Sequence, residues 1–183
     1  FMNYRILGKT GFKVSEISLG TWQVGGKWGE SFSHENAEKI LNAAIDNGVN
    51  FIDTADVYGG GESEKAVGKV VKSRKEKVYI ATKCGRKLNP HTANMYTPEA
   101  LKKFVEASLL NMKIDSIDLI QLHCPPTEVF YKPEIFELFD KLKAEGKIKF
   151  SCPSMETVTD MSFSLSSQKK TSKVLSAGKT TGL

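Results

Sequence analysis

The sequence predicts an α/β fold built on a parallel sheet, and three observations support this prediction. Short, β-branched and mostly apolar segments recur along the chain, which is typical of strands buried on both faces. Amphipathic helical patterns separate these segments, as in βαβ units. This alternation fits both a doubly wound sheet and a (β/α) barrel. A hairpin signal before the first helix does not belong to a plain doubly wound fold.

The hairpin is expected at the N-terminus, where residues 4–7 and 12–14 flank a turn from Gly8 to Gly11. Residues 17–19 form an early candidate strand. The strands expected after it are residues 49–53, 78–82, 117–122 and, with a weaker pattern, 147–150.

The helices expected between these strands are residues 37–45, 63–70, 98–112 and 133–146. Gly48 stands where a glycine commonly ends a helix, and Gly146 does the same for the last one. Thr97 is a suitable N-cap for the third helix, with Pro98 at its first position.

After residue 150 the composition changes. Serine, threonine and lysine supply about half of the residues that follow, and Glu156 and Asp160 are the only acidic ones. No periodic apolar pattern continues beyond Val158. We therefore expect a barrel domain over residues 1–150 and a disordered tail over residues 151–183.

The composition excludes several classes of protein. No apolar run reaches the roughly 18 to 20 residues that a membrane-spanning helix needs. The net charge of +5 comes without a basic stripe interleaved with aromatic residues, so nucleic-acid binding is not expected. Cys84, Cys124 and Cys152 are too few and too scattered for a disulfide framework. We expect a cytoplasmic protein.

Polar residues stand at the ends of successive predicted strands. Asp53, Lys83 and His123 each end one strand, and Tyr58 lies in the turn after Asp53. The carboxyl ends of barrel strands open on one face, where active sites are built. Each residue also has a plain structural reading: Asp53 as a helix cap, Lys83 as a solvated strand end, Tyr58 and His123 as packing residues. Their coincidence at corresponding positions favours a site.

These side chains suit carbonyl reduction. Reducing an aldehyde or ketone requires a hydride for the carbon and a proton for the developing alkoxide. A phenol is a weak acid at neutral pH, and a neighbouring ammonium group favours its ionised form. A carboxylate can hold the ammonium in place, and an imidazole can orient the carbonyl oxygen.

The same residues stand in motifs that resemble the aldo-keto reductase family. The segment FIDTADVYG at residues 51–59, followed by GESE at 61–64, is similar to the signature of that family. Further similar motifs are LGKTG at 7–11, LGTW at 19–22, ATK at 81–83 and LHCPP at 122–126. They occur in the family's order and spacing over residues 2 to about 150.

This resemblance implies a (β/α)8 TIM barrel with an N-terminal β-hairpin closing its base. It implies a catalytic tetrad of Asp53, Tyr58, Lys83 and His123, with Tyr58 as general acid. The implied cofactor is NADP(H), and the implied reaction is the reduction of a small-molecule aldehyde or ketone to an alcohol. No metal, nucleic acid or membrane partner is implied, and the protein would be a monomer or weak oligomer. The implied cofactor-binding residues are Gly20, Thr21, Trp22, Asp53 and Ser154.

The sequence departs from the family pattern after residue 149. The family has an aromatic residue, a glycine and then a hydrophobic–Ser–Asn run, whereas here Cys152, Pro153 and Met155 replace the glycine, the hydrophobic residue and the asparagine. A (β/α)8 barrel takes about 250 residues, and this chain has 183. We therefore expect a truncated barrel that lacks its C-terminal strands. Three interpretations remain open: an active reductase, a catalytically silent binding or regulatory relative, and a truncated product without activity.

Overall fold

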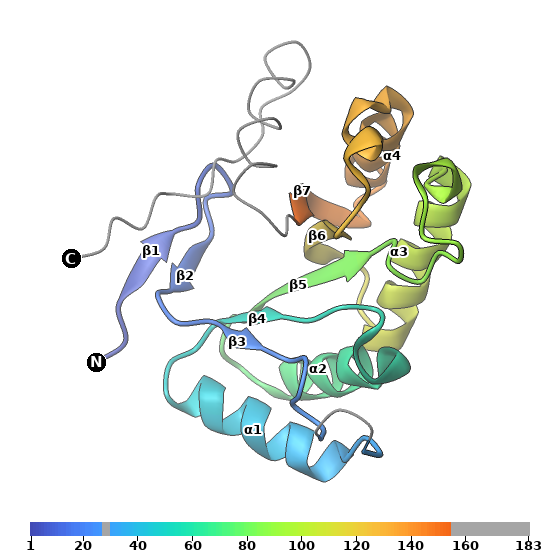
Figure 1. Cartoon of the computed structure of the whole chain (residues 1–183). Helices are drawn as coiled ribbons and strands as arrows, with labels where there is room; N and C mark the ends of the chain where they lie inside the picture. The colour runs from blue at the N-terminus through green and yellow to red at the C-terminus, as the bar shows by residue number, and fades with distance from the viewer. Residues whose placement is uncertain (27–29, 155–183) are drawn as a thin grey trace, which may run out of the picture.

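The computed structural model describes residues 1–26 and 30–154. An antiparallel hairpin of β1 (Tyr4–Ile6) and β2 (Lys13–Ser15) precedes a parallel sheet, as the sequence predicts (Figure 1). The strands of this sheet stand side by side in chain order: β3 (Leu19–Gly20), β4 (Phe51–Asp53), β5 (Tyr79–Cys84), β6 (Ile117–His123) and β7 (Ile148–Ser154).

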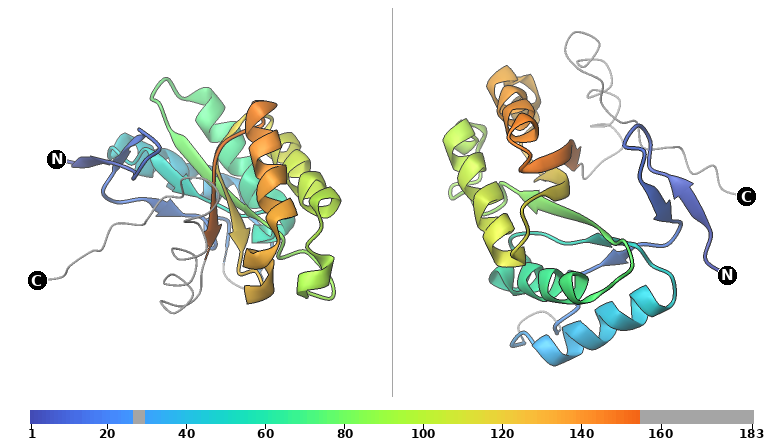
Figure 2. Two further views of the ribbon diagram at one scale, coloured as in Figure 1. Left: turned by 90° about the horizontal axis from the view of Figure 1, so that it is seen from above. Right: turned by 180° about the vertical axis from the view of Figure 1, so that it is seen from behind.

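One helix connects each strand to the next. These helices are α1 (His34–Asp46), α2 (Glu62–Ser73), α3 (Pro98–Met112) and α4 (Pro133–Ala144). They cover the outer side of a curved sheet, as both views in Figure 2 show. This arrangement is part of a (β/α)8 barrel, so the predicted fold class is confirmed. Within the described ranges, no helix is both long enough and apolar enough to cross a bilayer.

The core lies between the sheet and these helices. Apolar side chains from both layers are buried there, chief among them Leu41, Ile52, Val67, Ile80, Leu101, Val105, Ile120, Leu122, Ile135 and Leu142. The helical residues in this set all lie within the helices that the sequence predicts. Their burial holds the helices against the sheet.

Helix ends follow the local sequence. The side chain of Thr97 accepts a hydrogen bond from the Ala100 amide at 3.2 Å, which confirms its predicted role as the N-cap of α3. The side chain of Ser33 does the same for α1, a cap that the sequence reading did not identify. The chain turns after α1 at Gly48, which has a φ of +89°.

The hairpin lies against the starts of the sheet strands. The Phe12 ring stacks on Tyr79 with ring centroids 4.4 Å apart and meets Phe150 edge-on at 5.1 Å. The Asn50 side chain accepts a hydrogen bond from the Ser15 amide at 2.7 Å, just before β4 begins. The hairpin therefore occupies the amino-terminal end of the strands and leaves their carboxyl ends for a site.

Strand β7 extends further than the sequence predicts. The expected strand ended at residue 150, whereas the structure continues it to Ser154 alongside β6. Backbone pairing with β6 holds these additional residues in the strand: Cys152 lies opposite Gln121, and Ser154 lies opposite His123. The rest of the predicted tail, residues 155–183, lies outside the described residues.

Candidate active site

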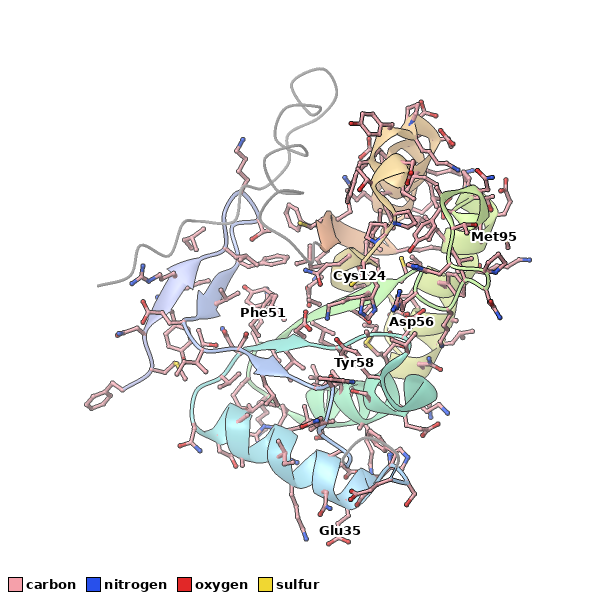
Figure 3. All side chains as sticks on the ribbon, viewed as in Figure 1. Glu35, Phe51, Asp56, Tyr58, Met95 and Cys124 are labelled. Carbon is pink, nitrogen blue, oxygen red and sulfur yellow. The ribbon has the colours of Figure 1, made fainter. Side chains whose placement is uncertain are left out.

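The predicted tetrad comes together at the carboxyl ends of three neighbouring strands. Asp53 ends β4, Lys83 lies at the end of β5, and His123 ends β6. Tyr58 begins a short 3-10 helix (Tyr58–Gly61) after the turn that follows β4 (Figure 3). Parallel pairing brings these positions to the same end of the sheet: Asp53 lies opposite Ala81 of β5, and Lys83 lies opposite Gln121 of β6.

Lys83 is the centre of this cluster. Its ammonium group forms an ion pair with the Asp53 carboxylate and donates to the Thr54 carbonyl at 3.0 Å. The same nitrogen lies 3.5 Å from the phenol oxygen of Tyr58. Only 8% of Lys83 is exposed. A buried charge needs a partner, and Asp53 supplies it while leaving the ammonium near Tyr58.

His123 completes the cluster from the side of Tyr58. The two rings meet edge-on, with centroids 5.9 Å apart and an interplanar angle of 90°. Both side chains are partly exposed, so both remain accessible from the mouth of the site. A carbonyl oxygen placed there would find a phenol and an imidazole side by side.

The turn that carries Tyr58 is fixed by backbone contacts. The Thr54 amide donates to the Ala81 carbonyl at 2.8 Å, and the Asp56 amide donates to the Lys83 carbonyl at 3.2 Å. Gly59 and Gly60 then adopt φ values of +56° and +67°, which turn the chain into α2. The sequence around Tyr58 thus ties the phenol to the strand that carries Lys83.

The residues expected to bind the cofactor differ in how exposed they are and in the hydrogen bonds they form. Gly20 pairs with Asp53, and a Cβ added to it would meet nothing within 4 Å. Trp22 follows at the end of β3 and is 60% exposed. Thr21 is fully buried, and its hydroxyl donates to the Asp53 carbonyl at 3.1 Å and accepts from the Ser63 hydroxyl at 2.8 Å. The backbone of Ser154 lies opposite His123.

Thr21 belongs to a hydroxyl network beneath the tetrad that the sequence reading did not assign. The Ser63 hydroxyl also lies 3.0 Å from the Thr54 hydroxyl. This hydrogen bond joins the first turn of α2 to the turn that follows β4. Next to Ser63, the fully buried Glu64 accepts hydrogen bonds from Thr82 at 2.6 Å and from Asn111 at 2.9 Å. The signature motif contains Ser63 and Glu64, but only the structure shows their hydrogen bonds. Ser63 bonds to Thr21 and Thr54, and Glu64 bonds to Thr82, the neighbour of Lys83 on β5.

Asp56 is a second residue that sequence reasoning missed. It lies between Asp53 and Tyr58 and is 2% exposed, and neither carboxylate oxygen has a side-chain hydrogen-bond partner among the described residues. Burial raises the pKa of this carboxyl group to about 7, with Lys87 opposing the shift and Glu64 adding to it. A turn residue of this kind is ordinarily exposed, so the sequence carries no signal of its burial.

Comparison with known proteins identifies the same family that the motifs indicate. Residues 16–175 match the Aldo/keto reductase family, well beyond the residue 150 at which the recognisable motifs end. Aldo-keto reductase YhdN of Bacillus subtilis is 37% identical over 165 residues, which cover 85% of this chain and 50% of that protein. The chain therefore spans about half the length of such relatives.

Solved structures share the fold. An aldo-keto reductase from Bacillus halodurans in its holo form superimposes with a TM-score of 0.77 at 29% identity, over 91% of this chain and 54% of that one. An aldo-keto reductase from Klebsiella pneumoniae in complex with NADPH gives a TM-score of 0.68 at 28% identity, over 88% of this chain and 52% of that one. With the family match covering most of its residues, this chain belongs to the aldo/keto reductase family of oxidoreductases.

Proposed function

We propose that this protein is an NADPH-dependent reductase that converts aldehydes or ketones to alcohols, with Tyr58 as the general acid. The observation that carries the proposal is the position of the Lys83 ammonium, which is 3.5 Å from the Tyr58 oxygen and paired with Asp53. The family supports oxidoreductase chemistry in general terms. Because the chain spans about half of its relatives' length, the activity of this polypeptide is itself part of the proposal.

The proton would pass from Tyr58 to the substrate. As the carbonyl carbon is reduced, negative charge develops on its oxygen, and the Tyr58 hydroxyl donates to it. The Lys83 ammonium stabilises the phenolate that remains, and Asp53 keeps the ammonium in place. His123, edge-on to Tyr58, orients the carbonyl oxygen from the other side.

The nicotinamide cofactor would supply the hydride and lie beside the ends of β3 and β7. Gly20 leaves open space next to Asp53, and Trp22 offers an exposed ring nearby. Thr21 would contribute only its backbone, since its hydroxyl is engaged within the protein. Ser154, whose backbone lies opposite His123, would contribute to the same site from β7. The complex of the Klebsiella pneumoniae relative with NADPH favours this cofactor.

The first test replaces Tyr58 by phenylalanine in the full chain. Tyr58→Phe removes the acid and little else, so we expect reduction of an aromatic aldehyde to fall at least about 100-fold, the lower end of general-acid effects. The affinity for NADPH, measured by fluorescence titration, should stay nearly unchanged. Tyr4→Phe is the matched control, because Tyr4 lies in β1 of the hairpin and should leave both quantities unaltered.

The outcomes separate the three interpretations of the sequence. Turnover in the parent chain that disappears in Tyr58→Phe supports an active reductase. Tight NADPH binding without turnover in the parent chain would instead identify a silent binding protein. Absence of binding, with a molten circular dichroism spectrum, would identify an inactive product. Undiminished reduction by Tyr58→Phe would remove Tyr58 from its proposed role.

A further inference from the structure

A groove lies on the outer side of the helical layer, apart from the tetrad. Helix α2 packs between α1 and α3 (Figure 1). Residues of these three helices line an open groove with a volume of about 540 Å³. Helix α1 contributes His34 and Glu38, α2 contributes three lysines, and the end of α3 contributes residues 110–113. None of the tetrad residues lines it.

Close backbone packing holds α3 against α2 next to this groove. Gly68 on α2 faces the end of α3 so closely that a Cβ added to it would lie 2.1 Å from the Met112 carbonyl oxygen. The last turn of α3 is thereby drawn against the middle of α2. Leu110 is left on the rim with 77% of its surface exposed, an apolar side chain among charged ones.

The groove carries an excess of positive charge. Lys65, Lys69 and Lys72 are spaced so that they follow one face of α2. Lys65 pairs with Glu62 at 2.7 Å, and Lys69 pairs with Glu38 at 2.5 Å. Lys72 forms no ion pair with any described residue, and the same holds for Lys113, which caps the end of α3. Two uncompensated ammonium groups therefore line the same groove as the exposed Leu110.

We propose that this groove binds a small organic anion that carries a phosphate group on an apolar body. The phosphate would lie between Lys72 and Lys113, since compact ammonium groups bind phosphate as point charges. The apolar body would cover Leu110. The cavity volume falls within the range of about 300 to 1,000 Å³ that is typical of small-molecule sites. This second site takes no part in the proposed reduction.

Phenyl phosphate is a suitable probe, because it combines both chemical features. Amide NMR spectra of the ¹⁵N-labelled full chain would be recorded during its titration. We expect saturable shifts at Lys72, Leu110 and Lys113, with inorganic phosphate binding the same residues more weakly because it offers nothing to Leu110. No saturation below about 10 mM, the weak end of measurable affinities, would overturn the proposal.

Variants distinguish a site from a general charge effect. Lys72→Gln combined with Lys113→Gln should weaken phenyl phosphate binding about tenfold, since two charged partners are lost. The control combines Lys103→Gln with Lys141→Gln, which removes the same charge from exposed positions on α3 and α4 outside the groove. Equal weakening in both double variants would show that net charge alone attracts the anion, and would overturn the proposal.

Discussion

Lys83 and Asp56 show how differently two buried charges are handled within one site. Lys83 has the Asp53 carboxylate, the Thr54 carbonyl and the nearby phenol of Tyr58. Asp56 is buried as well, and burial disfavours the ionised form of its carboxyl group, whose oxygens have no side-chain hydrogen-bond partner among the described residues. The first residue was predictable, because it ends a strand and matches a motif. The second was not, because its burial depends on how the β4 turn packs against β5.

The raised pKa of Asp56 predicts a pH-dependent stability. The pKa of Asp56 is about 7 in the folded protein, above the ordinary value of 3.8. Between these two pH values the folded protein therefore keeps a proton on Asp56 that the unfolded chain has released. The associated stabilisation is complete below about pH 4 and is lost as the pH rises towards and through 7. Between pH 5 and pH 8 this group alone should lower the free energy of unfolding by up to roughly 3 kcal/mol.

Asp56→Asn isolates this contribution, because asparagine does not titrate. Urea unfolding at pH 5 and at pH 8 would give, for the parent chain and for the variant, the change in the free energy of unfolding between the two pH values. We expect this free energy to fall clearly less in the variant as the pH rises from 5 to 8. Identical pH dependence in the two proteins would show that the Asp56 carboxyl group is ionised and satisfied in the folded state.

The secondary-structure elements were largely predictable because their patterns are local. Helix α3 begins where Thr97 and Pro98 indicate, and α1 buries Ala37, Leu41 and Ile45. Ile40, which the same apolar pattern placed on the buried side of α1, is exposed. The end of β7 was not predictable, because residues 151–154 have little strand character of their own and are held by pairing with β6. The same limit applies to α2, whose position against α3 depends on a contact between residues far apart in the sequence.

That contact gives a prediction about Gly68. Helix propensity alone favours alanine over glycine in a helix interior by up to about 1 kcal/mol. A Cβ at this position, however, would lie 2.1 Å from the Met112 carbonyl oxygen, so α2 and α3 would have to separate. We expect Gly68→Ala to lower the free energy of unfolding by about 1 to 3 kcal/mol, as overpacked cores do. An increase in stability by urea denaturation would show that the helices do not approach this closely.

At the scale of the whole molecule, the two ends of the sheet strands have different roles. The hairpin meets the strand starts through Phe12, Tyr79 and Phe150, and the tetrad occupies the carboxyl ends. Alternation of strands and helices predicted the α/β class, and the motifs predicted the barrel. The groove between α1, α2 and α3 could not be foreseen, because it needs three helices from different parts of the chain.

The proposed chemistry requires Tyr58 and Lys83 to act as one proton-donating unit. A double-mutant cycle on the reduction rate tests this, using Tyr58→Phe, Lys83→Met and the two changes combined. Because residues of one unit lose their effect together, the double variant should be about as slow as the slower single variant. Rate losses that multiply, so that two falls of about 100-fold become about 10,000-fold, would show that the phenol and the ammonium act independently.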